Sequence, residues 1–173
     1  MAANLLIALG SNRRHGRHGA PAGVVAAAML ALTAAGLRVL RRSRIHATAP
    51  VGPGGRSYAN AVVLADGDLP PAVVIATLKR IEAQFGRRGG RRWGDRVLDL
   101  DLLAADGVVL PSRLGWRHAS AGAIVPHPRL HSRDFVLDPL VEVAPDWRHP
   151  VLTATARQLR ARLQRRKRSR GSP

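Results

Sequence analysis

The chain is 173 residues long, and its length and composition fit a single globular domain with room for a hydrophobic core. Hydrophobic residues make up 46% of the chain and aromatic residues only 3%, so the core must be built from Ala, Val, Leu and Ile. The absence of cysteine excludes a disulfide framework, a thiolate metal site and a cysteine nucleophile. We find no signal peptide pattern and no stretch of membrane-spanning length, so we expect a cytoplasmic protein.

The formal net charge is +17, from 28 Lys and Arg residues against 11 Asp and Glu residues. Eight of the cations and no acid lie in Arg157–Pro173, so the rest of the chain carries 17 − 8 = +9. A charge of this size makes a nucleic-acid-binding protein a serious alternative. The chain nevertheless has few aromatic residues for base stacking and no recognisable DNA- or RNA-binding motif. We therefore expect no more than weak, non-specific binding of polyanions by the basic tail.

The first half of the chain alternates predicted strands with two predicted helices. Pro21 and Pro70 stand where proline favours the start of a helix, and Gly36 and Gly86 stand where helices end. In the second helix, apolar residues recur at the spacing of a stripe that faces the core: Val74, Leu78, Ile81 and Phe85. Apolar or alternating runs predict three strands, over residues 4–9, 37–47 and 57–65.

The second half predicts one more long strand, from Val97 to Leu103, and two further helices. Asp106-Gly107 is a hairpin signal that leads into a short strand at Val108–Leu110. A helix is expected over Phe135–Val143, and Thr153 is expected to cap a last helix that runs into the basic tail.

The element order β-α-β-β-α-β favours a ferredoxin-like α+β fold, in which helices pack against one mostly antiparallel sheet. The sequence shows no internal repeat and no second domain. We expect one domain over residues 1–156 and a basic C-terminal tail over residues 157–173, which ends the last helix and is then disordered.

Charged residues of both signs gather between Arg91 and Leu103. Along the predicted strand, alternate leucines form an apolar face, while Asp99 and Asp101 share the other face, roughly 7 Å apart at Cα. An isolated Asp-x-Asp pair is more often part of a solvated edge strand. Here three arginines precede the strand directly, and guanidinium groups bind phosphate while carboxylates bind hard divalent cations. The pattern therefore indicates a magnesium-nucleotide site.

A wider resemblance rests on three long blocks and three short ones. The long blocks are Ile7-Ala8-Leu9-Gly10-Ser11-Asn12, Arg92-Trp93-Gly94-x-Arg96-x-Leu98-Asp99-Leu100-Asp101-Leu102, and Val125-Pro126-His127-Pro128 with Arg133-x-Phe135-Val136-Leu137-x-Pro139-Leu140. The short blocks are Tyr58-x-Asn60, Arg80-Ile81-Glu82 and Val143-Ala144-Pro145. From Leu5 to Pro150 the chain resembles 6-hydroxymethyl-7,8-dihydropterin pyrophosphokinase, also called 2-amino-4-hydroxy-6-hydroxymethyldihydropteridine diphosphokinase. The resemblance implies transfer of pyrophosphate from ATP to the pterin hydroxymethyl group in folate biosynthesis, with release of AMP. It also implies two Mg²⁺ ions as cofactors.

The resemblance gives Asp99 and Asp101 to the two metal ions and places Arg92 and Arg96 with them as catalytic residues. Because the chain has no Walker lysine motif, the phosphates must be neutralised by metal and arginine. We expect no strong protein base; rate would come from positioning, from metal charge and from exclusion of water by the loop Gly86–Gly90. The ATP-binding residues that the resemblance implies are Lys79, Glu82, Arg87, Arg88, Arg92, Arg96, Leu102, His127 and Arg133.

A pterin is flat, polar along one edge and apolar on both faces, so its site needs stacking rings and a few hydrogen bonds to the edge. Tyr58 and Phe135 match the stacking pair of the family, although Phe135 taken alone would more often be a core residue. Asn60 offers both a donor and an acceptor to the edge. The pterin-binding residues that the resemblance implies are Thr48, Val51, Tyr58, Asn60, Trp93 and Phe135.

The chain departs from the family pattern at four places. Asp95 and Ala49 replace common prolines. The loop Gly86–Arg91 is shorter than usual, which leaves open which arginine contacts the phosphates: Arg87, Arg88 or Arg91. Gly115–Ala123 is an insertion that could cover or disturb the nucleotide end of the site. A relative acting on another pterin-like alcohol stays an alternative, and we expect the protein to be a monomer.

Overall fold

The computed structural model describes residues 3–48, 57–86 and 97–170. Within these residues one antiparallel sheet is formed by the strands β1 (Ala3–Ser11), β2 (Arg38–Arg42), β3 (His46–Thr48), β4 (Tyr58–Gly67) and β5 (Asp99–Ala105). The strand order is β2-β4-β1-β5, and β3 pairs with β4 beyond the end of β2. This order and these directions confirm the ferredoxin-like α+β class that the sequence predicts.

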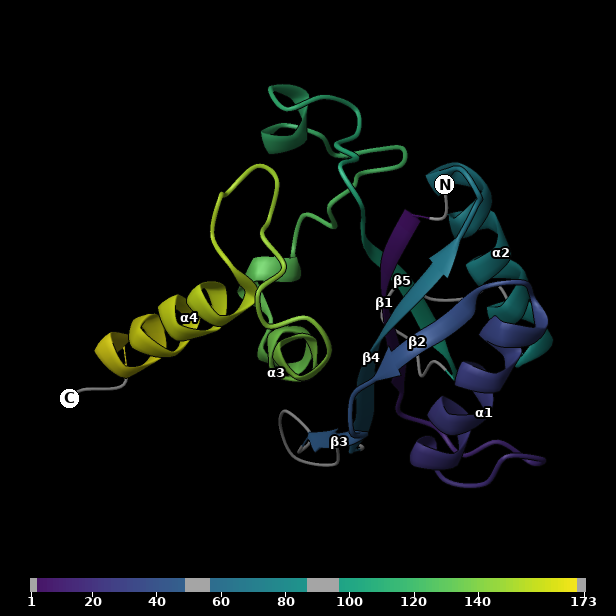
Figure 1. Ribbon diagram of the computed structural model, residues 1–173. Helices are drawn as coiled ribbons and strands as arrows, with labels where there is room; N and C mark the ends of the chain where they lie inside the picture. Colours follow the sequence, from purple (N-terminus) through teal and green to yellow (C-terminus); the bar gives the residue numbers. More distant parts are fainter. Residues whose placement is uncertain (1–2, 49–56, 87–96, 171–173) are drawn as a thin grey trace.

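Helices cover both faces of the sheet (Figure 1). On one side lie α1 (Pro21–Ala34) and α2 (Pro71–Gln84), and on the other lie α3 (Asp134–Val143) and α4 (Ala156–Arg170). Leu98, Leu100 and Leu102 are buried in the core formed with α1 and α2, so strand alternation turns Asp99 and Asp101 to the opposite face. Short 3₁₀ turns occupy Gly115–Arg117 and Leu130–Ser132. No helix among the described residues is both long and apolar enough to cross a membrane.

The ends of α1 and α2 lie close to where the sequence predicts them. Each helix begins at a proline, Pro21 or Pro71, which needs no backbone N–H there. Each is followed by a glycine with positive φ, 87° at Gly36 and 83° at Gly86, where glycine bears no steric penalty. The predicted stripe of α2 is buried in the core, so the burial of these residues is confirmed: Val74, Leu78, Ile81 and Phe85.

The single strand predicted over 37–47 is two strands in the structure, separated at Ser43. Ser43 N donates to the Val62 carbonyl oxygen (3.0 Å), and the Ser43 hydroxyl oxygen accepts from Val62 N (3.0 Å). The register of β2 against β4 also shifts between Val39 and Arg41. The side chain of Ser43 thus takes the place of a backbone carbonyl in the ladder, which ends β2, and pairing resumes at His46.

The strand predicted at Val108–Leu110 is wrong. The expected turn is present, with Gly107 at φ 67°. Leu110, however, pairs with Val125 across the irregular segment 111–124 and not with β5. The segment after the turn therefore does not extend the sheet beyond β5, whose outer edge is contacted by Lys79 and Glu82 of α2 and by the backbone of His127.

The predicted cap of the last helix at Thr153 is also wrong, because Thr155 caps α4. Gln158 N donates to Thr155 Oγ1 (3.2 Å), and Thr155 N donates to Gln158 Oε1 (2.9 Å). This reciprocal pair is a capping box, and its Thr-x-x-Gln spacing is visible in the sequence. The hydroxyl of Thr153 instead donates to the neighbouring carbonyl oxygen of Leu152.

Candidate functional site

The register of the sheet brings an amide and two carboxylates together on one face. Asn60 of β4 and Asp99 of β5 both lie opposite Gly10 of β1, so the three residues form a row across the sheet. Asp101 lies opposite Ala8, in a neighbouring row. A Cβ at position 10 would meet Asn60 Oδ1 at 3.2 Å. The missing side chain of Gly10 therefore keeps the space between Asn60 and Asp99 open.

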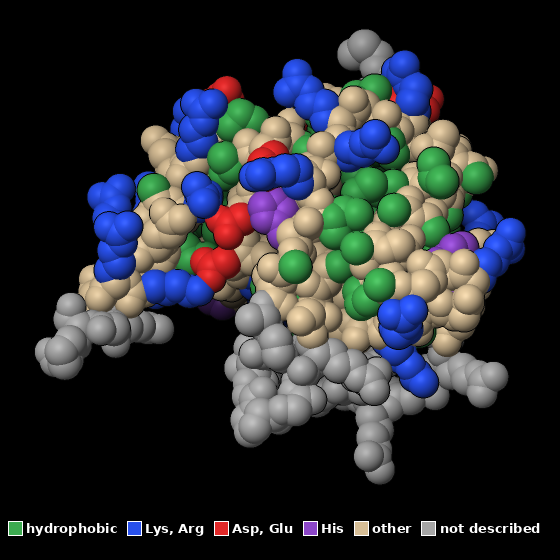
Figure 2. All heavy atoms as spheres, turned by 90° about the horizontal axis from the view of Figure 1, so that it is seen from below, with side chains coloured by type: hydrophobic (Ala, Val, Ile, Leu, Met, Phe, Trp, Pro, Cys, Tyr) green, Lys and Arg blue, Asp and Glu red, His purple; other side chains and the backbone are tan. Residues whose placement is uncertain are grey.

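Among the described residues, His127 and Arg133 lie within electrostatic range of this carboxylate pair and Arg129 lies within range of both these basic residues, all from the segment that leads into α3. Burial lowers the pKa of His127, an effect that nearby Asp101 opposes and nearby Arg133 and Arg129 reinforce. Burial also lowers the pKa of Arg133, again against the effect of Asp101. Figure 2 shows acidic side chains beside a histidine on one face, with Lys and Arg side chains around them. The site thus combines anionic groups that can hold a cation with cationic groups that can hold phosphate.

A pocket of about 450 Å³ opens beside Asp101. Its apolar wall comes from α2, β5 and the end of the insertion, and its polar groups include Lys79 and His127. Of the predicted ATP-binding residues, the structure therefore brings Lys79, Leu102 and His127 together next to a predicted metal ligand. An apolar cleft with a few convergent polar groups is the usual form of a small-ligand site.

Glu82 is fully buried and holds β5 in place. Its Oε1 accepts from Leu100 N (2.7 Å) and from Lys79 Nζ (2.8 Å). Lys79 Nζ also donates to the Leu100 carbonyl oxygen (3.2 Å). Because Leu100 stands between Asp99 and Asp101, the Lys79–Glu82 ion pair fixes the piece of strand that carries both carboxylates.

The residues expected to bind pterin that the structure describes lie on β3, β4 and α3. Asn60 Nδ2 donates to Thr48 Oγ1 (3.0 Å), and Thr48 lies opposite Tyr58 in the β3–β4 ladder. Tyr58 and Phe135 are 45% and 40% exposed, so neither is a core residue. The Arg133 guanidinium lies 5.5 Å from the centre of the Phe135 ring. Two exposed rings and a hydrogen-bonded amide are the parts that a flat polar heterocycle requires.

Several predicted site residues lie outside the described residues, and their roles stay predictions. These residues are Val51, Arg87, Arg88, Arg92, Trp93 and Arg96. The third loop candidate, Arg91, and the two departures Ala49 and Asp95 lie outside them as well.

The structure adds residues to the site that sequence reasoning missed. Arg129 affects the pKa of both His127 and Arg133, and it directly follows the block Pro126-His127-Pro128. Gly10 stands inside a strand, where a glycine signals the close approach of another group. Two residues of the predicted insertion, Gly122 and Ala123, line the pocket together with the next residue, Ile124, and no motif in the sequence pointed to these three.

The donor set of Asp99 and Asp101 fits magnesium. No cluster of three or more His, Cys, Asp or Glu side chains suited to a metal occurs among the residues that the structure describes. Magnesium does not need such a cage, because it is commonly bound through one or two carboxylates together with substrate phosphates and water. Two carboxylates on one strand face beside a pocket are therefore sufficient for a metal that arrives with a nucleotide.

Solved structures with the same fold include Plasmodium falciparum HPPK-DHPS. The wild-type crystal structure matches with a TM-score of 0.72 and 14% sequence identity, over 99% of this chain and 46% of that chain. Its complex with pteroate gives a TM-score of 0.74. At this identity the likeness shows the fold alone.

Sequence relatives named 2-amino-4-hydroxy-6-hydroxymethyldihydropteridine pyrophosphokinase occur in several bacteria. The Synechocystis protein is 39% identical over 135 residues, which are 78% of this chain and 64% of the relative. The Methylorubrum extorquens protein is 40% identical over 64% of this chain and 66% of its own length. The Pseudomonas aeruginosa protein is 34% identical over 152 residues, 87% of this chain and 86% of the relative. The chain thus spans slightly less than two thirds of the first two relatives.

The family model described as 7,8-dihydro-6-hydroxymethylpterin-pyrophosphokinase (HPPK) matches residues 6–145. This match covers most of the chain, including β2 to β5, all but the first three residues of β1, and every site residue named above. The chain therefore belongs to the 7,8-dihydro-6-hydroxymethylpterin pyrophosphokinase family.

Proposed function

We propose that the chain catalyses the reaction of its family, the transfer of pyrophosphate from ATP to 6-hydroxymethyl-7,8-dihydropterin with release of AMP, in folate biosynthesis. The observation that carries the proposal is the pair Asp99 and Asp101 on one face of β5, with the pocket beside it and Asn60 across Gly10. Nucleotide and pterin would meet above these carboxylates, with one substrate on each side.

On the nucleotide side, Lys79 and Leu102 line the pocket with His127, and Arg133 lies within electrostatic range of both carboxylates. Asp99 and Asp101 would hold two Mg²⁺ ions, which supply positive charge at the phosphates when bound. Asp99 would also orient the attacking hydroxyl group. The remaining phosphate contacts are assigned to arginines outside the described residues: Arg87, Arg88, Arg92 and Arg96.

On the pterin side, the exposed rings of Tyr58 and Phe135 would stack on the substrate, and Asn60 would hydrogen-bond to its edge. Thr48 fixes the orientation of the Asn60 amide through its hydroxyl group. Two further contacts are proposed outside the described residues, from the backbone at Val51 and from Trp93. The chemistry would need no strong protein base, since positioning, charge and exclusion of water supply the rate.

The test is an assay of purified protein with MgATP and 6-hydroxymethyl-7,8-dihydropterin, with the products separated by chromatography. We expect AMP to form in step with pterin pyrophosphate. Asp99→Ala and Asp101→Ala should each lower turnover more than about 100-fold, because either change removes a metal ligand, while circular dichroism stays unchanged. Asp146→Ala, which removes an exposed carboxylate that pairs with Arg157 at the surface, should leave turnover unchanged.

Three other outcomes of this assay would contradict parts of the proposed function. ADP in place of AMP would contradict transfer of pyrophosphate, and an active Asp99/Asp101 double variant would contradict the metal site. AMP formed only with a different pterin-like alcohol would mean that the substrate has changed while the reaction has not.

The enzyme is proposed to act in the cytoplasm, because its pyrophosphate donor is the intracellular nucleotide ATP. We also propose that it is a monomer. The catalytic domain is assigned to residues 1–156 and the basic tail to residues 157–173. The tail is not separate from the fold, since α4 packs on α3 through buried Leu159 and the ion pair of Arg160 with Asp138 (2.5 Å).

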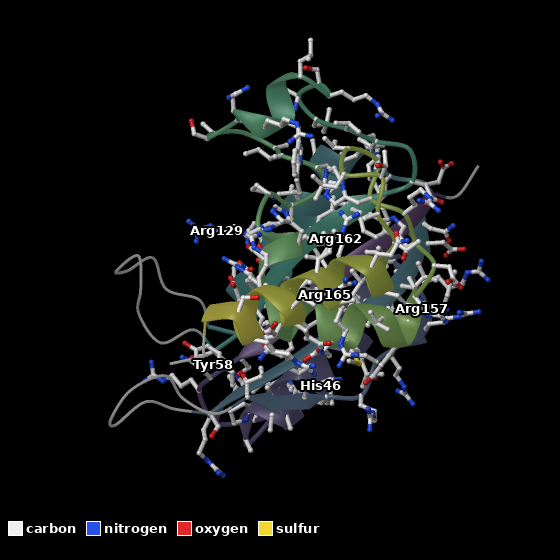
Figure 3. The ribbon with its side chains drawn as sticks, turned by 90° about the vertical axis from the view of Figure 1, so that its left-hand side faces the viewer. His46, Tyr58, Arg129, Arg157, Arg162 and Arg165 are labelled. Atoms are coloured by element: carbon white, nitrogen blue, oxygen red, sulfur yellow. The ribbon has the colours of Figure 1, made fainter. Side chains whose placement is uncertain are left out.

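The exposed side of α4 is the basis of a second proposal, weak and non-specific binding of polyanions. One open face of this helix carries Arg157, Arg162, Arg165 and Arg166 side by side. Figure 3 shows Arg157, Arg162 and Arg165 along the side of the molecule that faces the viewer. Only Arg157 of these four has a carboxylate of the described residues within ion-pair distance, so the others are available to phosphate or sulfate groups.

Retention on heparin, measured against salt, tests this second proposal. Deleting residues 157–173 would remove Leu159 from the core, so charge-removing substitutions are the better tool. The triple variant R162Q/R165Q/R166Q should elute at lower salt and keep its turnover. The variant R13Q/R14Q/R17Q removes the same charge from a different loop. Equal shifts in both variants would show an effect of net charge and would contradict a binding surface on α4.

A further inference from the structure

The predicted insertion Gly115–Ala123 lies within a longer loop, residues 111–124, that is closed at its base. The ends of this loop are joined where Leu110 N donates to the Val125 carbonyl oxygen (2.8 Å) and Val125 N donates to that of Leu110 (3.3 Å). Inside the loop, Gly115 sits so close to Pro111 and Ser112 that a Cβ would lie 3.1 Å from a side-chain atom of each. The 3₁₀ turn that starts at Gly115 is thus tightly packed.

That turn directs Trp116 inward, where its indole is only 6% exposed. Trp116 Nε1 donates to the Pro126 carbonyl oxygen at 2.5 Å, in a buried position. The indole also packs edge-on against His149, with 5.1 Å between the ring centres. A large buried aromatic side chain with its N–H satisfied is a strong local anchor, and this chain has few aromatic residues.

The carbonyl that Trp116 holds directly precedes His127. On its other side, His127 N donates to the Leu103 carbonyl oxygen of β5 (2.8 Å). The peptide segment that carries His127 is therefore fixed between β5 and the insertion. Ala123, the last residue of the predicted insertion, and Ile124 form part of the same pocket wall.

We propose that Trp116 is a positioning residue, which holds the Pro126–His127 segment against the nucleotide pocket and thereby raises affinity for MgATP and not for the pterin. The inference rests on the proposed nucleotide site. The insertion would then be a working part of the enzyme, because it supplies both a wall of the pocket and the donor that fixes its histidine.

The test is Trp116→Phe, which keeps an aromatic ring and removes the N–H donor. Calorimetry with a magnesium complex of a non-hydrolysable ATP analogue and, separately, with 6-hydroxymethylpterin gives the two affinities without turnover. We expect the dissociation constant of the nucleotide to rise about tenfold, because the buried Pro126 carbonyl loses its partner, and that of the pterin to stay unchanged. A purely structural role would change both affinities or neither.

Trp147→Phe is the matched control, because Trp147 also packs near His149 (5.7 Å) but makes no contact of this kind with Pro126. Gly115→Ala is a second variant, which displaces the turn while keeping the indole, and it should show the same selective loss. Unchanged nucleotide affinity in Trp116→Phe, or an equal loss in Trp147→Phe, would overturn the inference alone. A wild-type protein that does not bind the analogue would overturn the proposed function as well.

Discussion

At the scale of single residues, the site depends as much on a missing side chain as on those present. Asn60 and Asp99 can flank one space because the residue between them, Gly10, has no Cβ. The strand pattern predicts which residues share the face, but only the register of β4 and β5 against β1 shows that these three meet. Register depends on long-range pairing, which is why sequence reasoning placed Asn60 and Asp99 in one site only through the family resemblance.

Gly10→Ala should impair pterin binding. The new Cβ would press on Asn60 Oδ1 at 3.2 Å and displace an amide that is already bonded to Thr48. We expect the KM for the pterin to rise about tenfold, equivalent to ~1.4 kcal/mol, with the KM for ATP unchanged. Gly67→Ala is the control: its Cβ would be equally crowded, 3.1 Å from Leu37 Cδ2, but at the far end of β4. Equal effects of both substitutions on the pterin KM would refute the role of Gly10.

His149 should make the protein less stable in acid. It is fully buried, its Nδ1 accepts from two backbone N–H groups, and burial together with nearby His131 lowers its pKa to about 4. Between pH 6.5 and 4 the unfolded chain takes up a proton that the folded chain does not. The free energy of unfolding should therefore decrease as the pH is lowered from 6.5 to 4, by about 3 kcal/mol over the whole window.

Urea denaturation at several pH values measures this effect. His149→Asn keeps an acceptor for the backbone N–H groups and cannot titrate, so its stability should fall less steeply from pH 6.5 to pH 4. His118→Asn, which changes an exposed histidine, should behave like the wild-type protein. A slope that is the same in His149→Asn and in the wild type would show that another group dominates the acid sensitivity.

At the scale of elements, the local signals predicted most of the fold. Prolines, glycines and apolar periodicity located α1 and α2, because helix ends and faces depend on neighbouring residues. Two of the wrong predictions concern contacts between residues far apart in the sequence. The break between β2 and β3 depends on hydrogen bonds between Ser43 and Val62, and Leu110 pairs with Val125 on the other side of the segment 111–124. The cap of α4 is a local feature, and the Thr155-x-x-Gln158 spacing in the sequence is sufficient to predict it.

Thr155→Ala should destabilise the protein by about 1 kcal/mol, because it removes the side-chain acceptor of the α4 capping box. Thr153→Ala should have a much smaller effect, since the Thr153 hydroxyl bonds only to the adjacent carbonyl oxygen. The free energy of unfolding from urea titration at neutral pH compares the two. If Thr153→Ala proves the more damaging substitution, the cap has been assigned to the wrong threonine.

At the scale of the whole molecule, each face of the sheet carries an apolar core under its helices, and the site lies between the two cores. The carboxylates, the amide and the basic segment before α3 lie on the α3 side, while α2 and β5 supply most of the wall of the proposed nucleotide pocket. The positive charge is distributed unevenly over the molecule, because α4 adds a dense group of arginines on the same side of the sheet as the site. The strong positive charge should aid encounter with MgATP, which is anionic, and should also oppose folding through self-repulsion.

Salt should therefore stabilise the protein. The exposed ion pairs that salt weakens, such as Arg44–Glu142, contribute little each, whereas repulsion among a net +17 acts over the whole surface. We expect the melting temperature to rise when NaCl is increased from about 0.05 M to about 0.5 M, over which screening becomes strong. The variant R162Q/R165Q/R166Q/R168Q, with 17 − 4 = +13, should start at a higher melting temperature and gain less from salt. A salt response as large in this variant as in the wild type would place the repulsion outside α4, in the remaining basic surface.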